Sequence, residues 1–146
     1  MLTVAQLMQE AILEAKKAHN EVPVGAVIEK DGVIIARAHN QRQTDGPLAH
    51  AEVLAIQRAY EALGERRLQG CTLYVTLEPC PMCAGAMIMA ELSGCVFGAW
   101  DERQGCCGSV YTLPEDPAFY HSVRCIGGVM EQECAALLRD FFRDKR

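Results

Sequence analysis

The chain has 146 residues, which is enough for one domain with a hydrophobic core. Half of its residues are apolar, 6% are aromatic, and the formal net charge is −5. This acidic balance is not typical of a general nucleic-acid binder, and no apolar run approaches the roughly 20 residues that span a bilayer. The N-terminus also lacks the basic and apolar regions of a signal peptide. We therefore expect a cytoplasmic protein with no membrane association.

The first half of the chain predicts a helix, a hairpin and a second helix. Apolar residues recur at helical spacing after residue 3, and this helix is expected to end near residue 20. Two β-rich runs, 24–30 and 33–38, are separated by an Asp-Gly dipeptide, which is a strong hairpin signal. A polar loop over 40–47 leads into a helix over 49–63, which a glycine ends.

The second half predicts further strands and helices, in chain order at 71–77 (strand), 81–92 (helix), 95–100 (strand), 123–126 (strand) and 131–143 (helix). The complete order is α-β-β-α-β-α-β-β-α, and its strand–helix–strand units favour parallel pairing. Helices on both faces of a mixed sheet are the economical packing for this order. The predicted fold class is α/β, a three-layer α/β/α domain over residues 1–146 with a mixed five-stranded central sheet.

Three side chains of zinc-ligand type and one carboxylate stand in two short segments. His50 and Glu52 lie at the start of one predicted helix, and Cys80 and Cys83 at the start of another. Zinc binds imidazole nitrogen and thiolate sulfur, and two cysteines three residues apart share one face of a helix. A helix N-terminus also favours thiolate over thiol. The pattern therefore predicts a zinc site held by His50, Cys80 and Cys83.

Three protein ligands leave one tetrahedral position for water, which points to hydrolysis rather than a purely structural site. Zinc lowers the pKa of such a water to about 7, and a nearby carboxylate can carry its proton to a substrate. We assign this shuttle to Glu52, because residues two apart on a helix point roughly 200° apart and Glu52 is poorly placed to chelate beside His50. A closed structural site would need a fourth ligand, for which the candidates are Cys71, Cys95, His39 and His121.

The remaining cysteines do not predict a disulfide framework, because the chain is too long and too regularly apolar for a small stapled scaffold. Four of them fall in predicted strands or helices and are interpreted as buried free thiols: Cys71, Cys95, Cys125 and Cys134. Cys106 and Cys107 lie in a predicted loop and have no assigned role. A second metal or a redox switch is the alternative for that pair.

His-x-Glu followed by Pro-Cys-x-x-Cys is the signature of zinc deaminases, and the chain resembles the cytidine and deoxycytidylate deaminase superfamily. The resemblance runs over almost the whole chain. Its matching segments are 21–27, Asn40, 47–52, 73–86, 97–99 with Asp101, 108–109, 133–138 and 140–143. The Gly108-Ser109 pair and the Asp-Phe-Phe-Arg ending at 140–143 narrow it to the bacterial deaminases that act on adenosine in tRNA.

This resemblance implies a cytidine deaminase-like fold and a homodimer with one zinc ion per subunit. It also implies conversion of adenosine to inosine at the wobble position of a tRNA anticodon stem-loop. Asn40 would contact the target base, and the Ala51 backbone and Asp101 would lie near the target nucleotide. Phe142 and Arg143 would lie on a terminal helix that approaches the RNA.

The implied mechanism is attack of zinc-bound hydroxide on C6 of the base, with Glu52 protonating the ring and then the departing amine. Departures from the family pattern lie around the rim of the site, where Leu48 replaces a small hydroxyl residue and Trp100 stands where a basic residue is common.

Two alternative functions stay open. One is deamination of a free base or nucleoside, such as guanine or cytidine, which the acidic charge favours; the other is a zinc-stabilised RNA-binding protein without catalysis.

Overall fold

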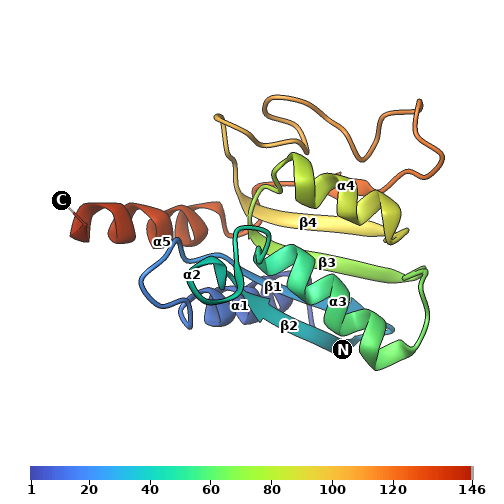
Figure 1. Ribbon diagram of the computed structural model, residues 1–146, viewed down its shortest axis with the longest axis horizontal. Helices are drawn as coiled ribbons and strands as arrows, with labels where there is room; N and C mark the ends of the chain where they lie inside the picture. Colours follow the sequence, from blue (N-terminus) through green and yellow to red (C-terminus); the bar gives the residue numbers. More distant parts are fainter. Residues whose placement is uncertain (146) are drawn as a thin grey trace.

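The protein has three layers, with a five-stranded sheet between two pairs of helices (Figure 1). The structure is a computed structural model that describes residues 1–145. The strands are β1 (Gly25–Lys30), β2 (Val33–His39), β3 (Cys71–Leu77), β4 (Gly94–Ala99) and β5 (Arg124–Ile126). The helices are α1 (Val4–Ala15), α2 (Arg42–Asp45), α3 (Ala51–Leu63), α4 (Pro81–Met89) and α5 (Glu131–Asp144).

The sheet is mixed, in the order β2-β1-β3-β4-β5. Strand β1 is antiparallel to both of its neighbours, whereas β3, β4 and β5 are parallel. The predicted hairpin is confirmed, and its turn residues Asp31 and Gly32 have φ of 52° and 82°, as a two-residue primed turn requires. These directions bring the carboxyl ends of β2, β3 and β4 to one edge of the sheet, together with the amino end of β1.

Alternate residues of the central strands enter two separate apolar clusters. Ala26 and Ile28 pack with alanines of α3 and with Met87 of α4, and Val27 and Tyr74 pack with α1 and with the start of α5. Helices α3 and α4 therefore cover one face of the sheet, and α1 and α5 cover the other. The predicted three-layer arrangement with a mixed five-stranded sheet is confirmed.

Element boundaries differ from the sequence expectation mainly in the first half of the chain, although α4 also ends at Met89 and not at residue 92. Helix α1 ends at Ala15, before the expected end near residue 20. Helix α2 lies inside the segment expected to be a loop, and the carboxylate of Glu21 accepts hydrogen bonds from two of its backbone N–H groups. Helix α3 begins at Ala51, two residues later than predicted, because His50 has an extended backbone. Within residues 1–145, every helix is too short or too polar to cross a bilayer.

Candidate active site

The candidate site lies at the sheet edge where β2, β3 and β4 end. The residues that directly follow these strands are Asn40, Glu78 and Trp100, and all three line one cavity. Helices α3 and α4 begin at the same edge, so that two helix N-termini point towards it. In α/β sheets, ligands bind outside the carboxyl ends of the strands. The topology thus brings together segments that are far apart in the sequence.

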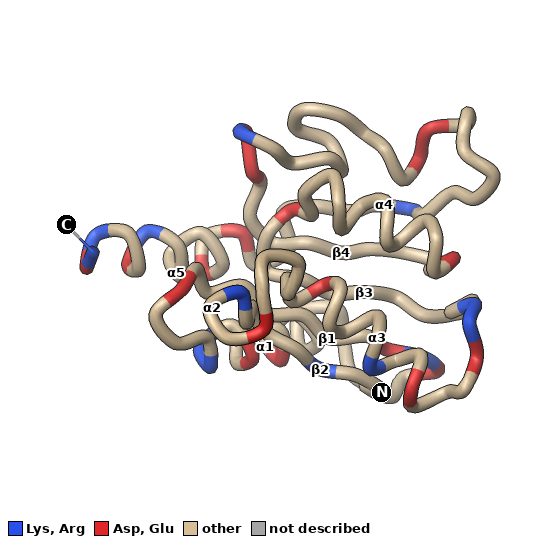
Figure 2. The backbone as a smooth tube through the Cα atoms, viewed as in Figure 1, with Lys and Arg blue, Asp and Glu red and all other residues tan. Residues whose placement is uncertain are grey.

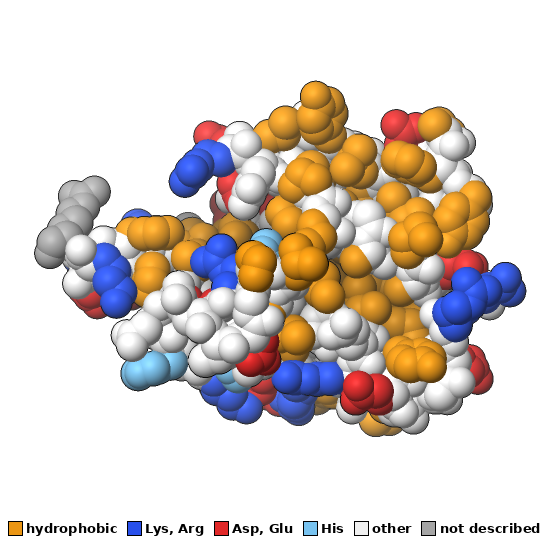
Figure 3. Space-filling model, in the orientation of Figure 1, with side chains coloured by type: hydrophobic (Ala, Val, Ile, Leu, Met, Phe, Trp, Pro, Cys, Tyr) orange, Lys and Arg blue, Asp and Glu red, His pale blue; other side chains and the backbone are white. Residues whose placement is uncertain are grey.

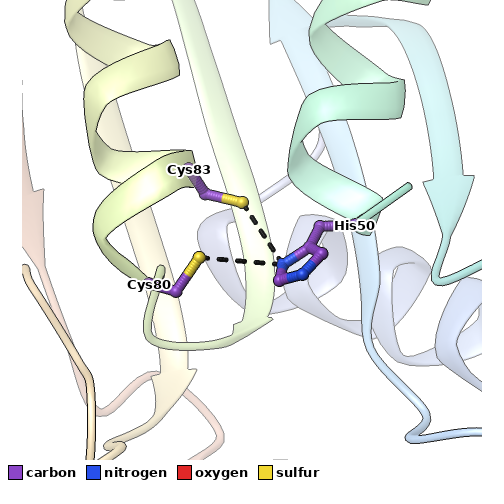
Figure 4. Close-up of side chains that lie close together, drawn as sticks. All are labelled: His50, Cys80 and Cys83. Carbon is purple, nitrogen blue, oxygen red and sulfur yellow. Dashed lines mark hydrogen bonds between the residues drawn. The ribbon is translucent and has the colours of Figure 1, made fainter. Parts of the chain in front are cut away.

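His50, Cys80 and Cys83 converge at this edge (Figure 4). His50 is the N-cap of α3, Cys80 is the N-cap of α4, and Cys83 lies in the first turn of α4. The Nδ1 atom of His50 is 3.7 Å from the Cys80 sulfur and 3.6 Å from the Cys83 sulfur. Ordinary zinc–nitrogen and zinc–sulfur bond lengths at a tetrahedral angle place such atoms about 3.6 Å apart. The three side chains therefore have the spacing of a zinc site.

No fourth protein ligand joins this group within residues 1–145. It is the one set of three or more His, Cys, Asp or Glu side chains there whose ligand atoms all lie within 4.8 Å of one another. Of the four candidates, His39 faces Glu14 at 3.7 Å, the His121 ring contacts the Leu92 carbonyl at 2.7 Å, and Cys71 and Cys95 are in the core. A three-ligand donor set is that of a catalytic zinc site, which keeps one position for water or substrate.

Cys106 and Cys107 are both buried, and within residues 1–145 they belong to no such group of ligand atoms. Of the four cysteines predicted to be buried free thiols, Cys71, Cys95 and Cys134 are free and buried, whereas Cys125 is free but only partly buried.

The two cysteines of the cluster share one proton. The pKa of Cys80 is lowered to about 4, because the Cys83 thiol and His50 hydrogen-bond to its sulfur. The hydrogen bond with Cys80 and burial both raise the pKa of Cys83, and the Cys80 contact also raises the pKa of His50. One thiolate thus exists in the pair near neutral pH. A divalent cation in place of the shared proton favours the second thiolate, because metal binding releases protons from its ligands.

Glu52 stands beside the cluster without belonging to it. It is the second residue of α3, it is 4% exposed, and it lines the same cavity as His50 and Cys80. Burial raises the pKa of Glu52 to about 7. A carboxyl group with a pKa near the working pH both accepts and donates protons readily. Glu52 is therefore equipped to move protons beside a metal.

The cavity has a volume of about 700 Å³ and extends from the cluster to α5. Asn40, Asp101 and Phe142 line it, as does Arg42 of the short helix α2. Arg143 lines an adjoining cavity of about 440 Å³ along α5.

Asn40 joins the end of β2 to the start of α3. Its Oδ1 accepts the N–H of Ala51 at 2.9 Å, and its Nδ2 donates to the Val22 carbonyl at 3.1 Å. Asn40 is 5% exposed and Ala51 is fully buried. An amide group carries two N–H donors, so one of them is left for a group in the cavity.

Asp101 holds a turn at the rim of the cavity. Its Oδ1 accepts the backbone N–H groups of Arg103 and Gln104, at 3.0 and 3.4 Å. This bonding shapes the segment that follows β4.

Glu78 is a residue of the site that sequence reasoning missed. It is 2% exposed, and its carboxylate accepts the backbone N–H groups of Asp101, Cys107 and Ser109 at 2.9 to 3.0 Å, together with the Ser109 hydroxyl. These bonds tie both ends of the loop over 101–109 to the end of β3. The available signal was an acidic residue directly after a buried strand, since a buried carboxylate requires several donors.

The sequence of the chain is similar to those of known deaminases. The family model for the cytidine and deoxycytidylate deaminase zinc-binding region matches residues 1–99. The chain is 52% identical over 142 residues to a tRNA-specific adenosine deaminase of Bacillus subtilis (strain 168), covering 95% of this chain and 88% of that protein. It is 44% identical over 142 residues to a tRNA-specific adenosine deaminase of Agrobacterium fabrum, with coverage of 95% and 93%.

Solved structures of deaminases also superpose on the chain. One from a study of A-to-I editing by tRNA:A34 deaminases at the wobble position of transfer RNA superposes with a TM-score of 0.86 and 41% identity, covering 90% of this chain and 98% of that chain. A guanine deaminase from Bacillus subtilis superposes with a TM-score of 0.65 and 39% identity, with coverage of 68% and 66%.

The anchoring role of Glu78 is testable by Glu78→Gln. Both carboxylate oxygens of Glu78 accept backbone N–H groups. In either orientation, the NH₂ group of the glutamine side chain would therefore face a backbone N–H donor. We expect the free energy of unfolding to fall by about 1–3 kcal/mol, and the amides of residues 101–109 to exchange faster. Urea denaturation and hydrogen exchange measure these effects, with Glu102→Gln in the same loop, at an exposed position, as control. Unchanged exchange in the loop would show that Glu78 does not hold it.

Proposed function

The chain belongs to the cytidine and deoxycytidylate deaminase family, and from this premise we propose that it deaminates adenosine to inosine at the wobble position of a tRNA anticodon. The observation that carries the proposal is a three-ligand cluster with zinc spacing beside the buried carboxyl of Glu52. The relatives named as tRNA-specific adenosine deaminases support the substrate, because the cluster alone suits several bases. A tRNA substrate also agrees with the expected cytoplasmic location and with action as a single deaminase domain.

His50 would hold one zinc ion per chain through Nδ1, together with the sulfurs of Cys80 and Cys83. When bound, zinc lowers the pKa of a coordinated water to about 7 and so supplies a nucleophile at neutral pH. The two helix N-termini stabilise the thiolates that the metal requires.

Glu52 would move the protons of the reaction. Water adds to C6 of adenine, the C6–N bond breaks, ammonia leaves and a carbonyl oxygen remains. Glu52 would take the proton released by the attacking water, give it to the ring nitrogen and assist the departure of the amine. The buried Glu52 carboxyl, whose pKa is raised to about 7, suits both transfers, because neither its protonated nor its ionised form is strongly disfavoured.

The walls of the cavity would position the nucleotide. The remaining N–H of Asn40 would contact the base, with the buried Ala51 backbone behind it. Asp101 at the rim and Phe142 and Arg143 on α5 would contact the RNA around the target. The target base must leave the helical stack to enter the cavity, which costs least in a single-stranded anticodon loop.

We also propose that the enzyme is a homodimer. Figure 3 shows hydrophobic side chains gathered over α4 and the loop that follows β4. Helix α4 carries no charged residue, and Met89 at its end is exposed, as are Phe119 and Tyr120 of the loop. The Tyr120 hydroxyl donates to the Ile88 carbonyl, so this loop lies against α4. An extended exposed apolar surface of this kind is typical of protein–protein interfaces.

The catalytic proposal is tested with Glu52→Gln on an anticodon stem-loop that carries adenosine. We expect inosine formation to fall by about 10²–10⁴-fold, with zinc content unchanged, as measured by mass spectrometry of the digested RNA. Glu61→Gln, at an exposed position of the same helix, is the matched control. Wild-type turnover of free guanine or cytidine without turnover of the stem-loop would favour a free-base deaminase. No turnover of any of these substrates would leave the non-catalytic alternative.

The metal assignment is tested with Cys83→Ala. We expect elemental analysis to give about one zinc ion per wild-type chain and none in the variant. The melting temperature should also fall, because metal binding stabilises the folded state. Cys95→Ala is the matched control, since it removes another buried thiol and leaves the cluster intact. Full zinc retention in Cys83→Ala would contradict the assignment.

The dimer is tested with Met89→Glu, which places a charge in the apolar surface over α4. Sedimentation velocity should give a dimer for the wild type and a monomer for this variant. Leu13→Glu replaces an exposed apolar residue of α1, on the other face of the sheet, and should remain dimeric. A monomeric wild type would refute the proposal.

A further inference from the structure

We propose that Trp100 is a stacking platform for a nucleobase that neighbours the target nucleotide in the RNA. This inference rests on the proposed function, because it assumes a single-stranded substrate that continues beyond the target base. It assigns a binding role to a residue that lies outside the metal cluster.

Trp100 stands between two cavities. It lines the cavity of about 700 Å³ beside the cluster and also the cavity of about 440 Å³ along α5, as do Leu138 and Phe142. The second cavity therefore continues the first. A strand whose target base occupies the space beside His50 and Glu52 can therefore continue along Trp100 into the second cavity.

The indole ring is held in place from one side and open on another. It makes an edge-to-face contact with Phe97, with ring centroids 4.9 Å apart and an interplanar angle of 88°. A Cβ atom at Gly108 would lie 2.9 Å from its Cζ3, and one at Gly127 would lie 2.8 Å from its Cζ2. Glycines at these positions thus make room for the ring, yet Trp100 remains 45% exposed. An aromatic surface held in advance loses little entropy when it binds.

The second cavity has the chemistry of a nucleotide site. Trp100 and the 53% exposed Phe142 offer aromatic surface, and Ala99, Ala135 and Leu138 add apolar wall. Within residues 1–145, the charged side chains that line it are Arg139 and Arg143, which can meet phosphate.

Basic and acidic residues alternate along the second half of α5 (Figure 2). Arg143 pairs with Asp140 and Asp144, each at 3.3 Å, and both pairs are exposed. Exposed pairs of this kind are weak, so a phosphate group can replace them. Base stacking on an aromatic ring depends little on net charge, and so gives an acidic chain a means of holding single-stranded RNA.

Trp100 is the only tryptophan of the chain, so intrinsic fluorescence reports on it directly. Zinc-loaded Glu52→Gln protein, which should bind RNA without turnover, is titrated with the adenosine-bearing anticodon stem-loop. We expect quenching of the tryptophan emission. We also expect the quenching to be lost when one neighbour of the target is abasic and kept when the other is abasic. RNA binding detected by anisotropy without quenching, or quenching that survives both abasic RNAs, would overturn the proposal.

Variants give the second test. Trp100→Ala should raise KM for the stem-loop about 5- to 100-fold, which is the effect of losing one stacked base, with kcat changed little. Trp100→Phe should restore most of the loss. On the RNA whose abasic neighbour abolishes the quenching, wild type and Trp100→Ala should have equal KM values. A merely structural role predicts instead an equal loss on both RNAs, with a lowered melting temperature, and would refute stacking.

The two proposals fail in different ways. If the wild type forms no inosine from any RNA, the proposed reaction is wrong, and the fluorescence titration still decides whether a base stacks on Trp100.

Discussion

The active site depends on two helices that begin at the same edge of the sheet. The N-caps of α3 and α4 are His50 and Cys80, and their extended backbones turn both side chains towards one point. The parallel pairing of β3 with β4 creates this geometry, because the connection between them must leave the carboxyl edge, where α4 starts. Both helix dipoles then favour negative charge on the sulfurs. The 3.6–3.7 Å spacing of the ligand atoms follows from that packing.

Three buried carboxylates near this edge have different surroundings and different uses. Glu21 accepts two backbone N–H groups of α2, and Glu78 accepts three from the loop over 101–109. Both are structural anchors, because their oxygens accept hydrogen bonds from the segments that they hold. Burial instead raises the pKa of Glu52 to about 7, so its carboxyl is suited to proton transfer. Residue type alone does not distinguish these roles.

Much of the fold was accessible from the sequence, because local patterns encode it. The Asp31-Gly32 turn, the helical periodicity of α1 and the order of strands and helices predicted the mixed α/β/α architecture, which is confirmed. Helix α2 was missed because its N-terminus is satisfied by Glu21, from a distant part of the chain. The start of α3 was misplaced because the extended conformation of His50 depends on its surroundings. Glu78 was missed because its donors lie 23 to 31 residues away.

By itself, the sequence determined the kind of chemistry. Cys-x-x-Cys across a helix start that Pro81 marks, and His-x-Glu at the start of another helix, specify ligand types and a short-range geometry that a helix start enforces wherever it lies. Only the tertiary structure decided that no fourth ligand among residues 1–145 joins the set, that Nδ1 of His50 faces the sulfurs, and that Trp100 links the cavity of the cluster to a second one along α5. The physical reason is the distance along the chain over which each feature is set. Spacing within a helix follows from the helical repeat, whereas distances between remote segments follow from strand order and the packing of the layers.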